Sequence, residues 1–111
     1  MPPFPSLRRK ADFDALARGG QARSTPLLVL RTMRTDGATT RIGFSTPKSL
    51  GGAVQRNRVR RRLRELVRER YGELGTGWDL LVIARPQAAR ASYADLREAF
   101  STLLGRSEIG R

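Results

Sequence analysis

The sequence predicts a small α+β protein, a two-layer α/β sandwich with the element order α-β-β-(β)-α-β-α, where the parentheses mark an optional strand. Apolar residues recur with a helical period over residues 53–71, whereas the apolar runs on either side have the length of strands. Turn and capping residues separate these segments. A chain of 111 residues, 39% of them hydrophobic, suffices for one modest core, so we expect a single domain over residues 1–111.

The first half of the chain alternates turn residues with apolar runs. Residues 1–10 are basic and contain proline, which is typical of a flexible arm. Asp12 can cap a short helix, ADFDALAR, which a pair of glycines ends. Two strands follow, LLVLRTMR and TRIGFST, and the dipeptide Asp36-Gly37 between them predicts a hairpin.

The second half predicts a helix, a strand and a helix. In the helix 53–71, one apolar stripe is formed by Val59, Leu63, Leu66 and Val67. The continuous apolar run WDLLVIA is typical of a strand that is covered on both faces. Ser92 and Asp95 form a capping pattern ahead of the last helix, and residues 106–111 follow as a tail. The apolar positions of that helix are Leu96, Ala99, Phe100, Leu103 and Leu104.

The residue types that the chain lacks limit its chemistry. It contains no cysteine and no histidine, which excludes disulfides, thiolate chemistry, the usual zinc sites and an imidazole base. No apolar run approaches the roughly 20 residues of a membrane span. The N-terminus has no long apolar segment ahead of its charges and is unlike a secretory signal. We therefore expect a cytoplasmic protein without membrane association.

The net charge of +12 is concentrated in one segment. Residues 56–70 contain eight arginines and only two glutamates, whereas residues 71–111 contain five basic and five acidic residues. Such a concentration is typical of a surface that binds a polyanion. RNA, DNA and an acidic membrane all remain open on charge alone.

The charged side of the helix 53–71 lies opposite its apolar stripe. The residues on that side are Asn57, Arg58, Arg61, Arg62, Arg64 and Arg68. One alternative is a solvated face whose arginines pair with Glu65 and Glu69. Two glutamates cannot neutralise eight arginines, however, and like charges at i and i+4 cost about 0.2–0.5 kcal/mol per pair. The arginine side is therefore predicted to bind a polyanion.

Asn57 is unusual in this helix because asparagine is a mediocre helix former. Its side chain offers both a donor and an acceptor, so it could orient the neighbouring arginines or contact a ribose hydroxyl or a base edge. The alternative is a capping or loop hydrogen bond near the start of the helix. Both interpretations remain open.

The segment GGAVQRNRVRRRLRE resembles the signature of the bacterial ribonuclease P protein component, which reads roughly G-x-A-V-x-R-N-R-x-(K/R)-R-x-x-R-(E/Q). The matching residues are Gly51, Ala53, Val54, Arg56, Asn57, Arg58, Arg60, Arg61, Arg64 and Glu65. The resemblance covers nearly the whole chain. SLRRKADFDALARGG is similar to the first helix of the family, RIGFST to the strand before the signature, and DLLVIARPQA to the strand and Arg-Pro turn after it.

The resemblance implies a fold and a function. The fold would be ribosomal protein S5 domain 2-like, with a left-handed β-α-β crossover where a right-handed one is the rule. The chain would be the protein subunit of a ribonucleoprotein that removes the 5′ leader from precursor tRNA. Its partners would be the catalytic RNA and the precursor tRNA, with no obligate protein partner. The RNA would form the catalytic centre and hold the Mg²⁺, so no catalytic or metal-binding residue and no tightly bound cofactor is expected in this chain.

The resemblance also implies which residues bind RNA. The expected contacts with the catalytic RNA are Lys48, Arg56, Asn57, Arg58, Arg60, Arg61, Arg62, Arg64 and Arg68. A cleft between the first helix and the sheet would take the single-stranded leader, with Arg9, Phe13 and Arg31 beside it. Bases stack on aromatic rings, and Phe13 matches such a position. The alternative for Phe13 is a plain core anchor of a short helix.

The chain departs from the family pattern at three places. Ala17 stands where a second aromatic residue is common in the first helix, and Arg31 stands where a tyrosine is common in the following strand. Lys48 alone keeps the charge of a common Ser-Lys-Lys segment. These departures favour a leader cleft that works more by charge than by stacking.

Three other functions share some of these features. A general RNA-binding or ribosomal-type protein would share the charge and the apolar pattern, but the signature disfavours it. A DNA-binding protein could lay the helix 53–71 in a major groove, yet no helix-turn-helix pair is recognisable. A nuclease acting alone would need a cluster of carboxylates, and the only close acidic pairs are Asp12/Asp14 and Glu65/Glu69.

Overall fold

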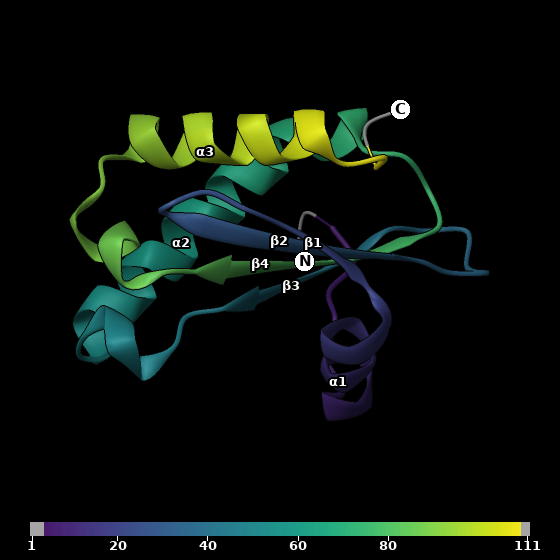
Figure 1. The fold of residues 1–111 in the computed structure, drawn as a ribbon, viewed down its shortest axis with the longest axis horizontal. Helices are drawn as coiled ribbons and strands as arrows, with labels where there is room; N and C mark the ends of the chain where they lie inside the picture. The colour runs from purple at the N-terminus through teal and green to yellow at the C-terminus, as the bar shows by residue number, and fades with distance from the viewer. Residues whose placement is uncertain (1–3, 110–111) are drawn as a thin grey trace.

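A four-stranded mixed sheet organises the chain in the computed structural model, which describes residues 4–109 (Figure 1). The strands are β1 (Gln21–Ser24), β2 (Leu28–Arg34), β3 (Arg41–Ser45) and β4 (Trp78–Ala84), in the spatial order β1-β2-β4-β3. The helices are α1 (Lys10–Gly19), α2 (Ala53–Arg70) and α3 (Tyr93–Arg106). Three short 3₁₀ turns, Lys48–Leu50, Tyr71–Glu73 and Pro86–Arg90, connect them. The predicted α+β class and element order are confirmed, including the optional third strand.

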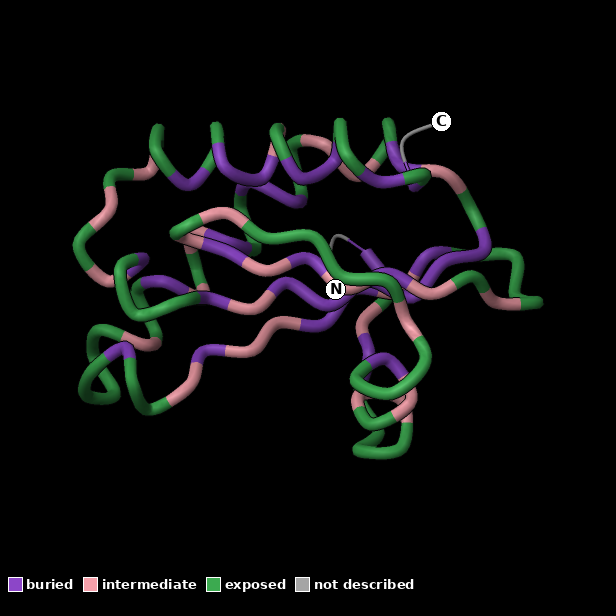
Figure 2. The backbone as a smooth tube through the Cα atoms, viewed as in Figure 1, coloured by how far each residue is buried: buried purple, intermediate pink, exposed green. Residues whose placement is uncertain are grey.

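The helices lie on opposite sides of the sheet. α2 and α3 cover one face, and α1 lies beneath one end of the other face (Figure 1). Figure 2 shows that the buried side of α3 is turned to the sheet and its exposed side to solvent. Much of the α1 side of the sheet has no helix over it. Among residues 4–109, no helix is long and apolar enough to cross a membrane.

The strand pairing shows that the hairpin predicted at Asp36-Gly37 is wrong. β2 and β3 do not pair with each other, because β4 lies between them, antiparallel to β2 and parallel to β3. The segment that joins β2 to β3 crosses the start of β4, where the amide of Thr35 donates to the carbonyl of Gly77 at 2.7 Å. This segment is too long for a two-residue turn. The highly apolar β4 is best buried at the centre of the sheet, which local turn signals do not report.

The hairpin of this fold joins β1 to β2. All four residues of β1 are exposed, so no alternation of apolar residues marks this strand in the sequence. The turn is closed by Thr25, whose amide donates to the carbonyl of Leu28 at 2.8 Å and whose hydroxyl accepts from the same residue's amide at 3.2 Å. A short polar edge strand is difficult to predict because nothing apolar must be buried.

The β3–α2–β4 connection joins two parallel neighbours, as the resemblance implies. The left hand of this crossover stays a prediction. The main core lies between the sheet and the helices α2 and α3, and it contains the expected apolar positions of both helices. Leu63, Phe100 and Leu103 are at most 1% exposed, and burying such a side chain contributes about 1.5–3 kcal/mol. Ser92 caps α3, as predicted, by accepting from the amide of Asp95 at 3.0 Å.

The two ends of the described chain are packed against the domain. Phe4 and Leu7 are buried, and the amide of Leu7 donates to the carbonyl of Ile42 at 2.9 Å, along the free edge of β3. The structure therefore differs from the expected flexible arm over residues 4–9. Ile109 is also buried, and its carbonyl accepts from the amide of Gly75 at 2.7 Å. Residues 1–3 and 110–111 lie outside the described part of the chain.

Candidate nucleic-acid interface

α2 has one buried and one exposed side, as its sequence period predicts. Val59, Leu63, Leu66 and Val67 are its buried residues. The exposed residues of the opposite side are Asn57, Arg58, Arg61, Arg64 and Arg68, and those only partly exposed are Arg56, Arg60 and Arg62. The exposed side therefore presents a row of guanidinium groups to solvent.

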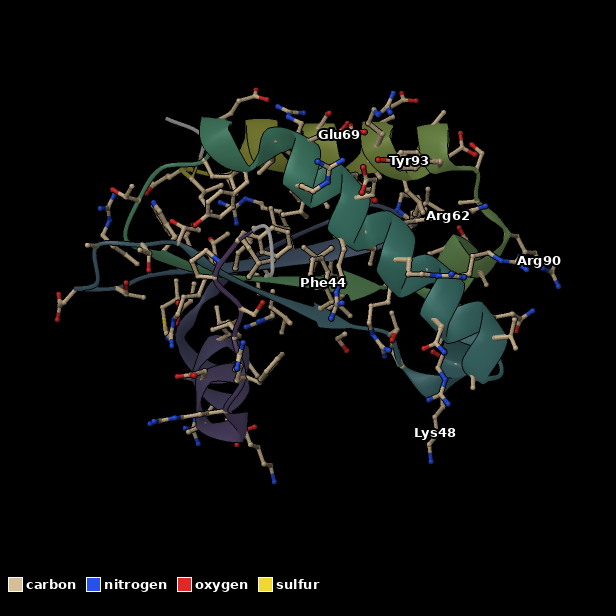
Figure 3. The ribbon with its side chains drawn as sticks, turned by 180° about the vertical axis from the view of Figure 1, so that it is seen from behind. Phe44, Lys48, Arg62, Glu69, Arg90 and Tyr93 are labelled. Atoms are coloured by element: carbon tan, nitrogen blue, oxygen red, sulfur yellow. The ribbon has the colours of Figure 1, made fainter. Side chains whose placement is uncertain are left out.

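The connection before α2 sets the start of this row. The 3₁₀ turn Lys48–Leu50 leads into α2, and the amide of Gly52 donates to the side-chain oxygen of Gln55 at 3.3 Å. Gln55 thereby satisfies one of the backbone donors that a helix N-terminus leaves unpaired. Figure 3 shows the side chain of Lys48 pointing away from the domain near this end of α2. The predicted RNA contact Lys48 is exposed and adjoins the arginine row.

Asn57 orients an arginine. Its side-chain oxygen accepts a hydrogen bond from Arg60 at 3.2 Å, and the same guanidinium donates to the hydroxyl of Thr46 at 2.6 Å. The structure thus confirms the interpretation that Asn57 orients a neighbouring arginine, whereas a contact of Asn57 with RNA stays a prediction. The capping role belongs to Gln55 instead. Arg60 is consequently held between α2 and Thr46, which follows β3, and Asn57 as a residue is exposed.

The last third of α2 contains both of its glutamates, and each of them is in an ion pair. Glu65 pairs with Arg68, whose hydrogen bond holds the pKa of this carboxyl below its usual range. Glu69 pairs with Arg97 of α3 at 3.5 Å and accepts from the hydroxyl of Tyr93 at 3.0 Å. The pairing of Glu69 with α3 rather than with an arginine of its own helix requires the tertiary fold. Figure 3 shows Glu69 and Tyr93 together between the two helices.

Arg62 also has a structural partner. It donates to the carbonyl of Ala91 at 3.0 Å, which ties α2 to the segment before α3. By contrast, Arg58, Arg61 and Arg64 form no ion pair or side-chain hydrogen bond with any of residues 4–109. The uncompensated charge of α2 therefore lies in its first two-thirds. We call Arg56, Arg58, Arg61 and Arg64 the free arginine row.

Two further observations concern the start of this interface, and one of them adds a residue that was not predicted. The Nε atom of Arg56 is buried and has no hydrogen-bond partner among the described residues. Arg90, at the end of the turn Pro86–Arg90, is exposed beside a shallow pocket that Ser49 and Gln55 also line. Sequence reasoning missed Arg90 because a single arginine after a turn carries no periodic signal. Figure 3 shows Arg90 and Lys48 at the same end of α2.

The other candidate surface is the sheet face on the side of α1. We call it the α1 face, and its residues are Val29, Arg31, Met33, Gly43, Ser45, Leu81 and Ile83. Phe13 and Leu16 of α1 pack on it, and Leu16 is fully buried whereas Phe13 is only partly buried. Arg9 is the exposed residue that precedes α1. The structure therefore brings Phe13 and Arg31 to one surface, and Arg9 lies one helical turn before Phe13.

Gly43 supports the ring of Phe13. A Cβ atom at this position would lie 2.9 Å from the Cε1 atom of Phe13 and 2.9 Å from the Cδ1 atom of Leu7. Such distances are far below van der Waals contact, so only glycine lets the ring lie against the backbone of β3. One edge of the Phe13 ring thus lies on the sheet, and Phe13 as a whole is only partly buried.

Replacing Gly43 by alanine should push Phe13 and Leu7 off the sheet. We expect a loss of about 1–3 kcal/mol in the free energy of unfolding, the usual cost of overpacking, measured by urea denaturation. Gly72→Ala is the matched control, since a Cβ atom there meets nothing within 4 Å. An unchanged stability of Gly43→Ala would show that Phe13 does not rest on β3.

Arg41 links α1 to the sheet. Its guanidinium donates to both carboxylate oxygens of Asp79, at 2.9 and 2.7 Å, and to those of Asp12 in α1 at 3.4 and 3.5 Å. The Asp79 side chain is only 3% exposed. The hydrogen bond with Asp79 raises the pKa of Arg41, and the charges of Asp79 and Asp12 add to this effect.

Arg31 closes the other end of α1. Its Nε donates to the carbonyl of Leu16 and its Nη2 to the carbonyl of Ala17, both at 2.9 Å. The last carbonyls of a helix lack backbone partners and carry partial negative charge. Arg31 thus has a defined bonding role in this chain.

Most of the close acidic residues have partners within the fold. Of the two close acidic pairs, Asp12 is bound to Arg41, and Glu65 and Glu69 are in ion pairs. Within residues 4–109 there is no group of three or more carboxylate, imidazole or thiol side chains that could hold a metal ion.

Arginines cover the exposed side of α2, and the first two-thirds of this helix carries uncompensated charge. This arrangement is typical of a protein that binds a large anion such as a nucleic acid. Its family is shown by comparison with known proteins. The chain belongs to the ribonuclease P family, because the family model described as Ribonuclease P matches residues 1–108.

Individual relatives agree with this assignment. The chain is 42% identical over 102 residues to the ribonuclease P protein component of Acidothermus cellulolyticus, covering 90% of this chain and 85% of that protein. It is 38% identical over 104 residues to that of a Roseiflexus species, covering 93% and 85%. Ribonuclease P protein components are subunits of an endoribonuclease that processes the 5′ end of tRNA.

Solved structures share the fold. The RNase P protein of Thermotoga maritima superposes with a TM-score of 0.84 at 27% identity, covering 93% of this chain and 97% of that one. The RNase P protein of Staphylococcus aureus superposes with a TM-score of 0.88 at 24% identity, covering 96% and 97%. The latter likeness concerns the fold alone.

Proposed function

We propose that this chain binds the catalytic RNA of ribonuclease P through α2 and the 5′ leader of precursor tRNA on the α1 face. The observation that carries the proposal is the free arginine row within the family signature. Four arginines that keep their charge and have no acidic partner among the described residues are unfavourable on one helix unless an external anion compensates them. The same task would place the protein in the cytoplasm, where precursor tRNA is processed.

The binding of the catalytic RNA would use phosphate contacts. The planar fork of arginine can hold two phosphate oxygens at once and cannot lose its proton near neutral pH. The free arginine row would supply the strongest contacts, with Lys48, Asn57, Arg60 and Arg90 around it. Arg62 and Arg68 would contribute less, because each already has a partner within the protein.

The binding of the leader would use the α1 face. The exposed part of the Phe13 ring would stack on an unpaired base, and Arg9 would offer a positive charge near the start of α1. Arg31 lies on the same face, although two of its nitrogens are engaged by α1. Mg²⁺ would belong to the RNA, which would carry out the phosphodiester hydrolysis, while the residues of this chain bind and orient.

The proposal predicts that the chain stimulates cleavage only together with RNA. Cleavage of a precursor tRNA would be measured at near-physiological magnesium with a bacterial ribonuclease P RNA alone, with the protein alone, and with both. We expect efficient cleavage at the mature 5′ end only with both components. The same RNA with the Arg61→Ala, Arg64→Ala variant provides the matched control.

Two other results would contradict the proposed function. Cleavage by the protein alone would place the chemistry in this chain and contradict the proposal. Tight RNA binding without any stimulation of cleavage would also contradict it and would favour the general RNA-binding function.

A further inference from the structure

α1 has only a small apolar contact with the rest of the protein. The apolar cluster between α1 and the sheet has three buried residues, Leu7, Leu16 and Leu81, with Phe13, Met33 and Ile83 partly buried around them, and Leu16 is the one buried residue of the helix. A ten-residue helix is marginal by itself in water. Polar contacts must therefore make a large contribution to holding α1 on the sheet.

The polar contacts lie at both ends of α1. At its first turn, Asp12 meets Arg41 of β3, which is itself held by two hydrogen bonds to Asp79 of β4. At its last turn, the carbonyls of Leu16 and Ala17 accept from Arg31 of β2. Two arginines from different strands of one sheet face thus bind the two ends of one helix.

The end at Arg31 is also constrained sterically. Gly20 follows α1, and a Cβ atom there would lie 2.8 Å from the carbonyl oxygen of Thr32. The chain passes this close to β2 directly beside Arg31. The close approach and the two hydrogen bonds together leave the last turn of α1 little freedom to shift along the sheet.

We infer that Arg31 and Arg41 are positioning residues, which fix α1 on the sheet and thereby set the place of Phe13 and the width of the surface open to the leader. This inference rests on the proposed function of the α1 face. Neither arginine needs to touch the leader for this role. The carboxylates of Asp12 and Asp79 offset the positive charge of Arg41, so this residue presents little net charge to a phosphate.

The charge of Asp12 makes the inference testable, because the two possible roles of Arg41 predict opposite effects of removing this charge on leader binding. Asp12→Asn removes a negative charge and leaves the buried Arg41–Asp79 pair intact. A surface that attracts the leader by charge would then bind it more tightly. A surface that depends on the position of α1 would bind it more weakly, because α1 loses its link to Arg41.

The matched control is Asp14→Asn. Asp14 lies on the same helix and is exposed, and it forms no ion pair within residues 4–109. The substitution changes the net charge by the same amount without touching Arg41. A third variant, Arg41→Lys, keeps the positive charge but loses the fork that reaches both carboxylates.

The measurement is the ratio of affinities for precursor and mature tRNA, using the reconstituted complex of RNA and full-length protein. We expect Asp12→Asn to lower this ratio about two- to fivefold, the loss of a partly exposed ion pair. Arg41→Lys should lower it as well, whereas Asp14→Asn should leave it unchanged or raise it. Hydrogen exchange of the α1 amides should be faster in Asp12→Asn and Arg41→Lys and unchanged in Asp14→Asn.

Equal behaviour of Asp12→Asn and Asp14→Asn in both readouts would overturn the inference. Phe13→Ala separates this failure from that of the proposed function. If Phe13→Ala lowers the ratio and Asp12→Asn does not, the leader site stands and the positioning role is wrong. If Phe13→Ala leaves the ratio unchanged, the leader site itself is wrong, while faster exchange in Asp12→Asn would still show that Arg41 holds α1.

Discussion

Replacing Arg61 and Arg64 together by alanine should weaken binding of the catalytic RNA and flatten the dependence of this binding on salt. Both side chains are exposed on α2, lie one turn apart and form no ion pair within residues 4–109. Each phosphate contact that is lost should reduce the slope of log K against log salt by about 0.7–0.9. The measurement is a titration of labelled RNA with protein at several salt concentrations.

A control with the same loss of charge distinguishes local contacts from net charge. Arg97→Ala with Arg106→Ala removes two exposed arginines from α3, where Arg97 pairs with Glu69. We expect only a small change in slope for this variant. Equal changes in slope for both double variants would show that RNA binding depends on net charge and not on the free arginine row.

The stability of the Arg61→Ala, Arg64→Ala variant helps to interpret the result. Replacing Arg64 removes like-charge repulsion with Arg60 and Arg68, worth about 0.2–0.5 kcal/mol per pair at i and i+4, and both substitutions place a better helix former in α2. The free energy of unfolding should therefore stay equal or rise slightly. Weaker RNA binding by an equally stable protein cannot be ascribed to unfolding.

Local signals explain which parts of the fold were predictable. The apolar period of α2 and the Ser92–Asp95 cap of α3 depend on residues within one or two turns of each other, and the structure confirms both. By contrast, β2 pairs with β4, which follows more than forty residues later in the chain. The Asp36-Gly37 signal, which is local, therefore predicted the wrong pair.

The same distinction applies to the candidate interface. The exposed side of α2 followed from its period, and the pair of Glu65 with Arg68 is an i, i+3 contact within one helix. The pair of Glu69 with Arg97, the bond of Arg62 to Ala91 and the position of Arg90 beside α2 all need α3 or its preceding segment in place. Sequence reasoning therefore identified the charged helix but could not show which arginines stay free.

The role of Arg31 shows most clearly what could not be predicted from the sequence. A charged residue in place of a tyrosine suggested a leader cleft that works by charge. The structure shows the guanidinium bound to the end of α1, about fifteen residues earlier in the chain. Its effect on the leader would then be indirect. Phe13 is therefore expected to contribute more to leader binding than Arg31.

Replacing Phe13 by alanine should weaken binding of precursor tRNA far more than binding of mature tRNA. The ring rests on Gly43 with part of its surface open, so a leader base can stack on it without displacing core residues. Stacking on an aromatic side chain contributes about 1–3 kcal/mol per base, so the affinity for precursor tRNA should fall about five- to 150-fold. The measurement is equilibrium binding of both tRNAs to the reconstituted complex.

Phe44→Ala is the matched control for the loss of an aromatic side chain. Phe44 follows Gly43 on β3 but points to the opposite face of the sheet, where it packs against the main core and lies near Phe4. Figure 3 shows Phe44 on the side of the sheet that α2 covers. We expect this variant to lose stability and to bind both tRNAs with the same relative affinity as before.

The comparison of these two phenylalanines separates a binding surface from a core contact. Both truncations remove a partly buried ring from the same region of the sheet, so a general loosening of β3 would affect precursor and mature tRNA alike. Only a ring that touches the leader makes the loss depend on the leader. An equal loss for both tRNAs in Phe13→Ala would therefore identify Phe13 as a core anchor of α1, and leader recognition would have to lie elsewhere on the protein.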